Sequence, residues 1–239
     1  MAPAVRVRSG NIVGVSTAAT SKPSDFAVVR FTDWGELRRR FPRLIVGLVC
    51  LGAGIGATLR ARLGLSPYDV LHQGLADRTG LSFGLVVVLL GLVILLVWIP
   101  LRQRPGVGTI VNTLTVGFIS NGVFDAIPTI NGLGVRWALL VAGVVVTALG
   151  IGLYIGCGLG PGPRDGLMTG IAARGYPIWL VRTLLELVAL AAGWLLGGNV
   201  GIGTVIFALA IGPLGHYFLH RLHLGVDVED PDPSATFGE

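Results

Sequence analysis

Charged residues are scarce in this sequence. They make up 13% of its 239 residues, whereas a soluble domain carries about 25%. Hydrophobic residues account for 52%, and the mean hydropathy is +0.76. This composition excludes an ordinary soluble domain and predicts a membrane protein.

Cysteines are almost absent, and so are the motifs of common catalytic and metal sites. Cys50 and Cys157 fall in apolar parts of different halves of the chain, which gives a disulfide framework no support. The sequence contains no HExxH, CxxC or GxSxG pattern and no Walker motif. It therefore offers no metal site, no cofactor, no serine nucleophile and no means of hydrolysing ATP, and we expect that the protein is not an enzyme.

What the sequence has in abundance is long apolar runs, each close to the length of about 20 residues that a transmembrane helix needs. They cover residues 44–59, 85–101, 107–124, 137–155, 178–196 and 200–219. The runs predict an all-α polytopic membrane protein with about six transmembrane helices.

The apolar runs fall into two similar halves, residues 41–130 and 135–222. The stretch LGLSPYDVLHQGLADRTG begins at Leu63, and LGPGPRDGLMTG begins at Leu159, 96 residues later. The offset aligns Asp69 with Asp165, and the alignment continues into the flanking runs. The halves therefore predict an internal repeat of about three spans each. Outside them we expect a largely flexible tail over residues 1–40 and an acidic, disordered tail over residues 223–239.

The repeated stretch predicts a short helix in each half. Ser66-Pro67 and Gly162-Pro163 are typical of helix starts, because proline is tolerated in the first turn. Asp69 and Asp165 then fall in the first turns of segments too short to span a bilayer, which favours interrupted or re-entrant helices. Two interpretations remain open for the aspartates. Either they cap interfacial helices, or they contact a substrate or ion.

Orientation follows from the arginines near the ends of the apolar runs. With a cytoplasmic N-terminus, nine lie inside and four outside, which favours cytoplasmic N- and C-termini because of the positive-inside rule. An odd number of spans in each half then makes the repeats inverted. This topology predicts that Asp69 and Asp165 lie near opposite faces of the membrane. The inside set is Arg38, Arg39, Arg40, Arg43, Arg102, Arg104, Arg164, Arg174 and Arg221, and the outside set is Arg60, Arg62, Arg78 and Arg136.

Four more ionisable residues are candidates for a substrate or ion pathway. Arg164 directly precedes Asp165, and His72 follows Asp69 by one turn, where its imidazole can act as a proton relay or simply be solvated. Arg182 and Glu186 stand four residues apart within an apolar run, so they can meet on one helix face. A charged side chain inside the membrane is costly unless it is paired. The pair is therefore either a structural ion pair that holds this helix against its neighbours or part of a substrate or ion pathway.

Glycines within the apolar runs predict close helix packing. Gly52 and Gly56 form a small-xxx-small pattern in the first run, and Gly152 and Gly156 form one in the fourth. The stretch Gly52–Ala57 also fits a dinucleotide-binding pattern, but that pattern requires a strand before it, so helix packing is the better interpretation.

The stretches SPYDVLHQGLADRTGLSFG, GLGPGPRDGLMTGIA and VGIGTVIFALAIGP occur in order between residues 44 and 222. On these motifs the chain resembles the YczE-like bacterial integral membrane proteins, relatives of the YitT proteins. The resemblance implies a multi-pass protein of the bacterial cell membrane, without a settled substrate or reaction.

Inverted repeats with interrupted helices and charges within the membrane favour a secondary transporter for a small solute. The alternative is a non-transporting scaffold or regulator that assembles with another protein or with lipid. In both hypotheses the protein contacts the lipid bilayer and does not bind nucleic acid. The sequence is compatible with a homo-oligomer.

Overall fold

The computed structural model describes residues 34–222, so the two predicted tails lie outside it except for residues 34–40. These seven residues are helical and continue into the first long helix. Helix α1 begins at Trp34 and runs without a break to Ala61. Its first turns contain Leu37 and the three arginines Arg38, Arg39 and Arg40, which are good helix formers.

The described residues form eight helices and no strand. Six of the helices are long and apolar enough to cross a membrane, while α2 and α6 are short and each begins at a proline. The predicted all-α fold with about six spans and two short helices is confirmed. The bounds are α1 Trp34–Ala61, α2 Pro67–Thr79, α3 Phe83–Leu101, α4 Val107–Ala126, α5 Leu133–Ile155, α6 Pro163–Ala172, α7 Ile178–Leu195 and α8 Ile202–Leu222.

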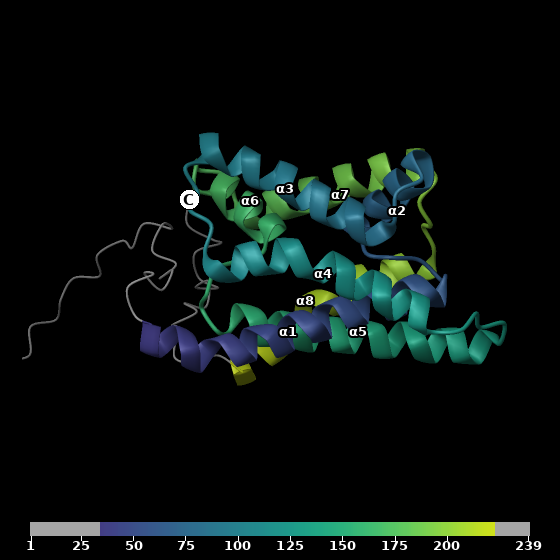
Figure 1. Cartoon of the computed structure of the whole chain (residues 1–239). Helices are drawn as coiled ribbons and strands as arrows, with labels where there is room; N and C mark the ends of the chain where they lie inside the picture. The colour runs from purple at the N-terminus through teal and green to yellow at the C-terminus, as the bar shows by residue number, and fades with distance from the viewer. Residues whose placement is uncertain (1–33, 223–239) are drawn as a thin grey trace, which may run out of the picture.

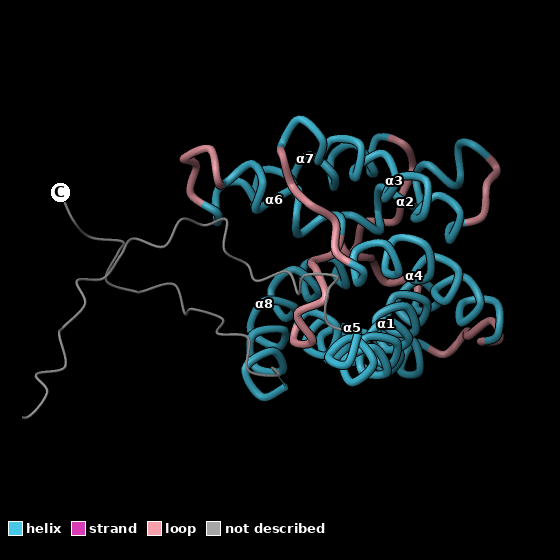
Figure 2. The backbone as a smooth tube through the Cα atoms, turned by 60° about the vertical axis from the view of Figure 1, so that its left-hand side comes forward, coloured by secondary structure: helices cyan, strands magenta, loops and turns pink. Residues whose placement is uncertain are grey.

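The helices are arranged in two layers (Figure 1). One layer contains α1, α4, α5 and α8, in which α5 packs on α1 and α8, and α4 packs on α1. The other contains the short helices α2 and α6 together with α3 and α7. Helix α4 also packs on α3, so it joins the layers, which Figure 2 shows from another side. Each half of the chain contributes two helices to each layer.

Helices α1 and α5 cross with their backbones almost in contact. A Cβ atom at Gly54 would lie 2.6 Å from the Gly143 carbonyl oxygen, and one at Gly47 would lie 2.7 Å from the Tyr154 backbone nitrogen. Because the contacts pair early residues of α1 with late residues of α5, the two helices are antiparallel. This glycine face was not among the predicted packing residues.

The four predicted packing glycines have other neighbours. Gly52 and Gly56 face α4, where added Cβ atoms would lie 2.7 Å from Ile119 and 2.5 Å from the Ser120 carbonyl oxygen. Gly152 faces Phe218 of α8 in the same way, and Gly156 is the buried C-cap residue of α5. The small-residue patterns therefore mark close helix approaches, as expected from small residues in membrane helices.

The loop before each short helix is bound by the start of a helix from the other half of the chain. The Gly203 N–H donates to the Leu63 carbonyl, and the Gly108 N–H donates to the Leu159 carbonyl, each at 2.8 Å. The hydroxyls of the next residues add a second bond each. Thr204 Oγ1 accepts from the Leu65 N–H, and Thr109 Oγ1 donates to the Pro161 carbonyl. We call these four hydrogen bonds the cross-half contacts.

Candidate functional site

Helix α2 begins with a side-chain cap that also holds Asp69. Ser66 is the N-cap residue, and its Oγ accepts from the Asp69 N–H at 3.2 Å. The same hydroxyl lies 2.5 Å from Asp69 Oδ2, to which it donates. Ser66 and Asp69 are 2% and 5% exposed. The serine therefore caps the helix and holds one oxygen of the Asp69 carboxylate, while Oδ1 is left to face another group.

His72 is the other partner of the Asp69 carboxylate. Its Nδ1 atom lies 3.3 Å from Asp69 Oδ1, and its ring meets Phe83 edge to face. The side chain is only 12% exposed, so His72 is not a solvated interfacial histidine. The two residues form one hydrogen-bonded unit at the start of α2.

Helix α6 begins without a side-chain cap, because its N-cap residue is Gly162. Trp98 of α3 fixes this end by donating its indole N–H to the Pro163 carbonyl at 3.0 Å. Asp165 is held from α5, since its Oδ2 accepts from the Tyr154 hydroxyl at 2.6 Å. The two aspartates are thus oriented by different partners, although they occupy equivalent positions in the sequence.

Arg164 supplies the permanent positive charge of the site. Its Nε lies 3.8 Å from Asp165 Oδ1, and its guanidinium stacks 5.1 Å from the centre of the Tyr68 ring. Burial works against the guanidinium charge, but the nearby Asp165, followed by Tyr154 and Glu186, outweighs it. The pKa of Arg164 is therefore held above its ordinary value. Burial also raises the pKa of Tyr68, which Arg164 opposes. Arg164 and Asp165 thus form a charged pair.

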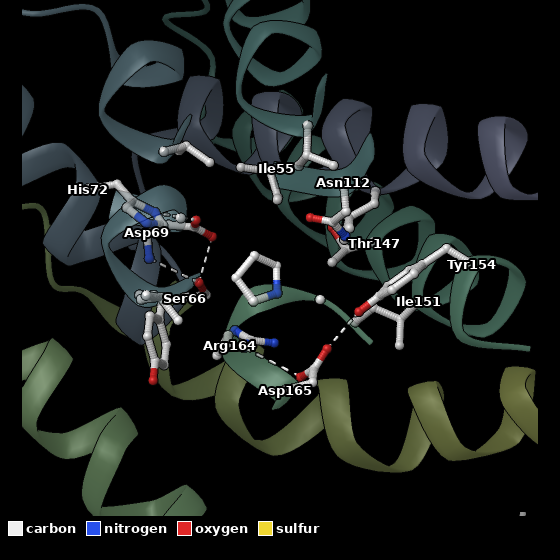
Figure 3. Close-up of a pocket in the computed structure, with 18 of the residues that line it drawn as sticks. Ile55, Ser66, Asp69, His72, Asn112, Thr147, Ile151, Tyr154, Arg164 and Asp165 are labelled. Atoms are coloured by element: carbon white, nitrogen blue, oxygen red, sulfur yellow. Dashed lines mark hydrogen bonds and ion pairs between the residues drawn. The ribbon is translucent and has the colours of Figure 1, made fainter. Parts of the chain in front are cut away.

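One cavity of about 130 Å³ brings both motifs together (Figure 3). Ser66, Asp69 and His72 line one side of it, and Arg164 and Asp165 line another. This corrects the prediction that the two motifs lie apart near opposite faces. The first turns of α2 and α6 both lie beside the cavity. From there the two helices extend away from the cavity, so their far ends are apart (Figure 1).

Equivalent positions of the two halves line this cavity together. Its lining includes five residue pairs separated by the offset of 96, contributed by α1 with α5 and by the start of α2 with that of α6. A sixth pair joins α4 to α8 with an offset of 95. The pairs are Leu51 and Thr147, Ile55 and Ile151, Ser66 and Gly162, Tyr68 and Arg164, Asp69 and Asp165, and Asn112 and Phe207.

Two uncharged polar side chains line the cavity without a hydrogen-bond partner in the described part of the chain. Asn112 is 9% exposed, and its Nδ2 atom lies 3.6 Å from the place a Cβ would take at Gly162. Thr147 is 2% exposed, and its Oγ1 atom is buried and unpaired. Because a buried polar group without a partner costs about 1–3 kcal/mol, Asn112 is suited to bind a polar molecule in the cavity, whereas Thr147 Oγ1 is enclosed against Gly54 of α1.

Arg182 and Glu186 form the predicted pair but do not line the cavity. Arg182 Nε lies 3.2 Å from Glu186 Oε1 on the outer side of α7. Their side chains are 46% and 27% exposed. Glu186 nevertheless lies close enough to affect the titration of Tyr68 and Arg164. Glu186 therefore lies near the Arg164 side of the cavity, although α7 does not line it.

Sequence reasoning missed three polar residues of this site, Tyr154, Asn112 and Thr147. Each lies inside an apolar run, where a single polar or aromatic residue is usually explained by packing. The repeat gave no signal for them, because the equivalent positions in the other half hold unlike residues. These are Thr58 for Tyr154, Phe207 for Asn112 and Leu51 for Thr147.

Trp98 was also not predicted as a site residue, although the internal repeat places a tryptophan at the equivalent position. With the offset of 96, its equivalent is Trp194, so the same residue type stands at both positions. The two side chains have different surroundings, since Trp98 is 1% exposed and Trp194 is 67% exposed. The repeated tryptophan therefore marks the position, but its contact with α6 could be found only in the structure.

The ionisable side chains of the cavity are not arranged as a metal site. Between residues 34 and 222, no group of three or more His, Cys, Asp or Glu side chains is placed to hold a metal ion. The charged groups at the cavity are instead Asp69 beside His72 and Asp165 beside Arg164.

The fold and the cavity define a polytopic helical membrane protein with a cavity that is lined by the starts of two short helices. The chain belongs to a family of unknown function (DUF6198), whose model matches residues 38–220. This finding and the relatives below confirm the resemblance to YczE-like proteins. No solved structure matches the chain.

Three relatives are similar to the chain over most of its length. An uncharacterized protein of Haemophilus influenzae is 36% identical over 78% of this chain and 86% of its own. The uncharacterized membrane protein YczE of Bacillus subtilis is 34% identical over 74% of this chain and 84% of its own. The uncharacterized protein YyaS of Bacillus subtilis is 29% identical over 73% of this chain and 89% of its own.

Proposed function

We propose that this protein is a secondary transporter for a small solute in the bacterial cell membrane. The observation that carries the proposal is a cavity at the starts of α2 and α6, which both aspartates line. Interrupted helices whose ends meet at a site between two halves are typical of transporters that work by alternating access. The unpartnered Asn112 gives a solute a further polar group to bind.

The proposal includes inverted repeats, for which the helix contacts give support. The first long helices of the two halves, α1 and α5, run antiparallel, as an inversion requires. Each short helix packs on a long helix from the other half, α2 on α7 and α6 on α3. Arg43 of α1 also donates to the Leu222 carbonyl at the end of α8, which is consistent with both termini on the cytoplasmic side.

The transport proposal is tested with purified protein. A panel of small solutes is screened for a rise in unfolding temperature, because a ligand that binds only the folded state stabilises it. Solutes that bind are then followed across proteoliposomes. We expect protein-dependent flux of at least one of them. The alternative, a scaffold or regulator, predicts neither stabilisation by solutes nor flux, and that outcome would reject the transporter.

The inverted topology predicts that the far ends of α2 and α6 are reached from opposite sides of the membrane. Leu81 follows α2 and is 39% exposed, while Tyr176 follows α6 and is 59% exposed. In a Cys50→Ala, Cys157→Ala background, Leu81→Cys and Tyr176→Cys are labelled in intact cells with a membrane-impermeant maleimide. We expect labelling at Leu81→Cys alone, with Tyr176→Cys reacting after the cells are opened. Labelling of both from one side would contradict the inversion.

A further inference from the structure

We propose that the solute is a small organic cation that binds beside Asp69 and exchanges for a proton on the pair formed by Asp69 and His72. The exchange rests on the proposed transport function, whereas the binding does not. The cation is indicated by the charges that line the cavity and by the apolar character of the remaining wall.

The charges around the cavity do not balance when His72 is neutral. Arg164 and Asp165 compensate each other at the start of α6. Asp69 has only Ser66 and His72 as partners and no permanent cation within the described residues. On α7, which lies outside the cavity, Glu186 is paired with Arg182. The sum is one uncompensated negative charge in a buried setting, which is costly unless a cation joins it.

The other titratable groups that face this region do not alter the balance. They are the hydroxyls of Tyr68 on α2 and Tyr154 on α5. The cavity-lining residues of α1, α3, α4 and α8 are all uncharged. The missing charge is therefore either a proton on the pair formed by Asp69 and His72 or a cation that enters the cavity.

The rest of the wall fits an organic cation better than a hydrated metal ion. It is formed mainly by aliphatic side chains and includes the rings of Tyr154 and Phe207, and aromatic faces attract ammonium groups. A cavity of roughly 150 Å³ holds a molecule the size of benzene, so the volume of about 130 Å³ suits a small alkylammonium ion. The Asn112 side-chain carbonyl provides an uncharged acceptor for one of its N–H groups.

Proton exchange follows from the contact between His72 Nδ1 and Asp69 Oδ1 at 3.3 Å. With neutral imidazole, the carboxylate pairs with the bound ammonium group. When the imidazole takes up a proton, it compensates Asp69 itself and the organic cation leaves. One proton enters as one cation departs, so the charge of the cavity is unchanged. Affinity for the cation therefore falls as the pH falls, by up to about tenfold per pH unit.

The test uses probes of equal shape and different charge. Binding of tert-butylammonium, tert-butanol and pivalate to the purified protein is measured by calorimetry between pH 6 and pH 8.5. We expect binding of the ammonium ion alone, weakening as the pH falls. Binding of pivalate or tert-butanol instead, or ammonium binding that does not change with pH, would overturn the inference, and neither result depends on a variant.

Variants locate the site. Asp69→Asn is expected to remove ammonium binding, and His72→Gln to retain it with little pH dependence. The matched control is Asp77→Asn, which changes an exposed residue of the same helix and should leave binding unchanged. Retained binding in folded Asp69→Asn would overturn the assignment. Cation binding without flux in proteoliposomes would reject the proposed transport but support this binding site. Flux of an anion would support transport but overturn the assignment of a cation site.

Discussion

Replacing Asp69 or Asp165 by asparagine is expected to leave the protein folded but to reduce solute flux by roughly tenfold or more, which corresponds to about 1.4 kcal/mol. Asparagine keeps the size of the side chain and can still accept a hydrogen bond from Ser66 or Tyr154. It removes the charge, which in a transporter contacts the solute or compensates its charge. Flux into proteoliposomes is the measurement, with unfolding temperature as the check on folding.

The same substitutions separate transport from helix capping. Because Ser66 already caps α2, the capping interpretation predicts little change in flux or stability for Asp69→Asn. Asp77→Asn serves as the control, since Asp77 is exposed on the same helix. Full flux in both asparagine variants would show that neither carboxylate takes part in transport.

The long helices could be predicted from sequence because membrane spans require apolar runs of a defined length. The starts of α2 and α6 could be predicted because proline and aspartate mark a first helical turn. Helix α1 begins at Trp34, ahead of the apolar run, and Arg38 to Arg40 extend it because arginine favours helix. The glycine face between α1 and α5 was missed because many glycines stand at suitable spacings.

The site could be predicted only in part. The repeat identified Asp69 and Asp165 as equivalent residues, but equivalence does not determine distance, and the convergence of the two motifs on one cavity depends on how the halves pack. Arg182 and Glu186 are paired as their spacing predicts, yet they lie outside the cavity because α7 contributes no lining residue. Tyr154 could not be inferred, because its partner Asp165 meets it only after α5 and α6 fold together.

Replacing Gly64 or Gly160 by alanine is expected to destabilise the protein by roughly 3 kcal/mol or more, through backbone strain and a steric clash. Their φ angles are +118° and +119°, in a region that favours glycine. An added Cβ would lie 2.7 Å from the Thr204 backbone nitrogen at Gly64 and 2.8 Å from Thr109 Oγ1 at Gly160. Thermal unfolding in detergent measures the loss.

Gly80→Ala separates the two causes, because Gly80 also has a positive φ, of +73°, but nothing lies within 4 Å of an added Cβ. It is expected to cost only about 1–2 kcal/mol from strain. The excess loss at Gly64 and Gly160 then reports their larger φ angles together with the steric clash beside the cross-half contacts. If all three variants lose the same stability, strain alone explains the result. A larger loss at Gly64 and Gly160 would show that the close packing of each loop against the other half of the chain stabilises the fold.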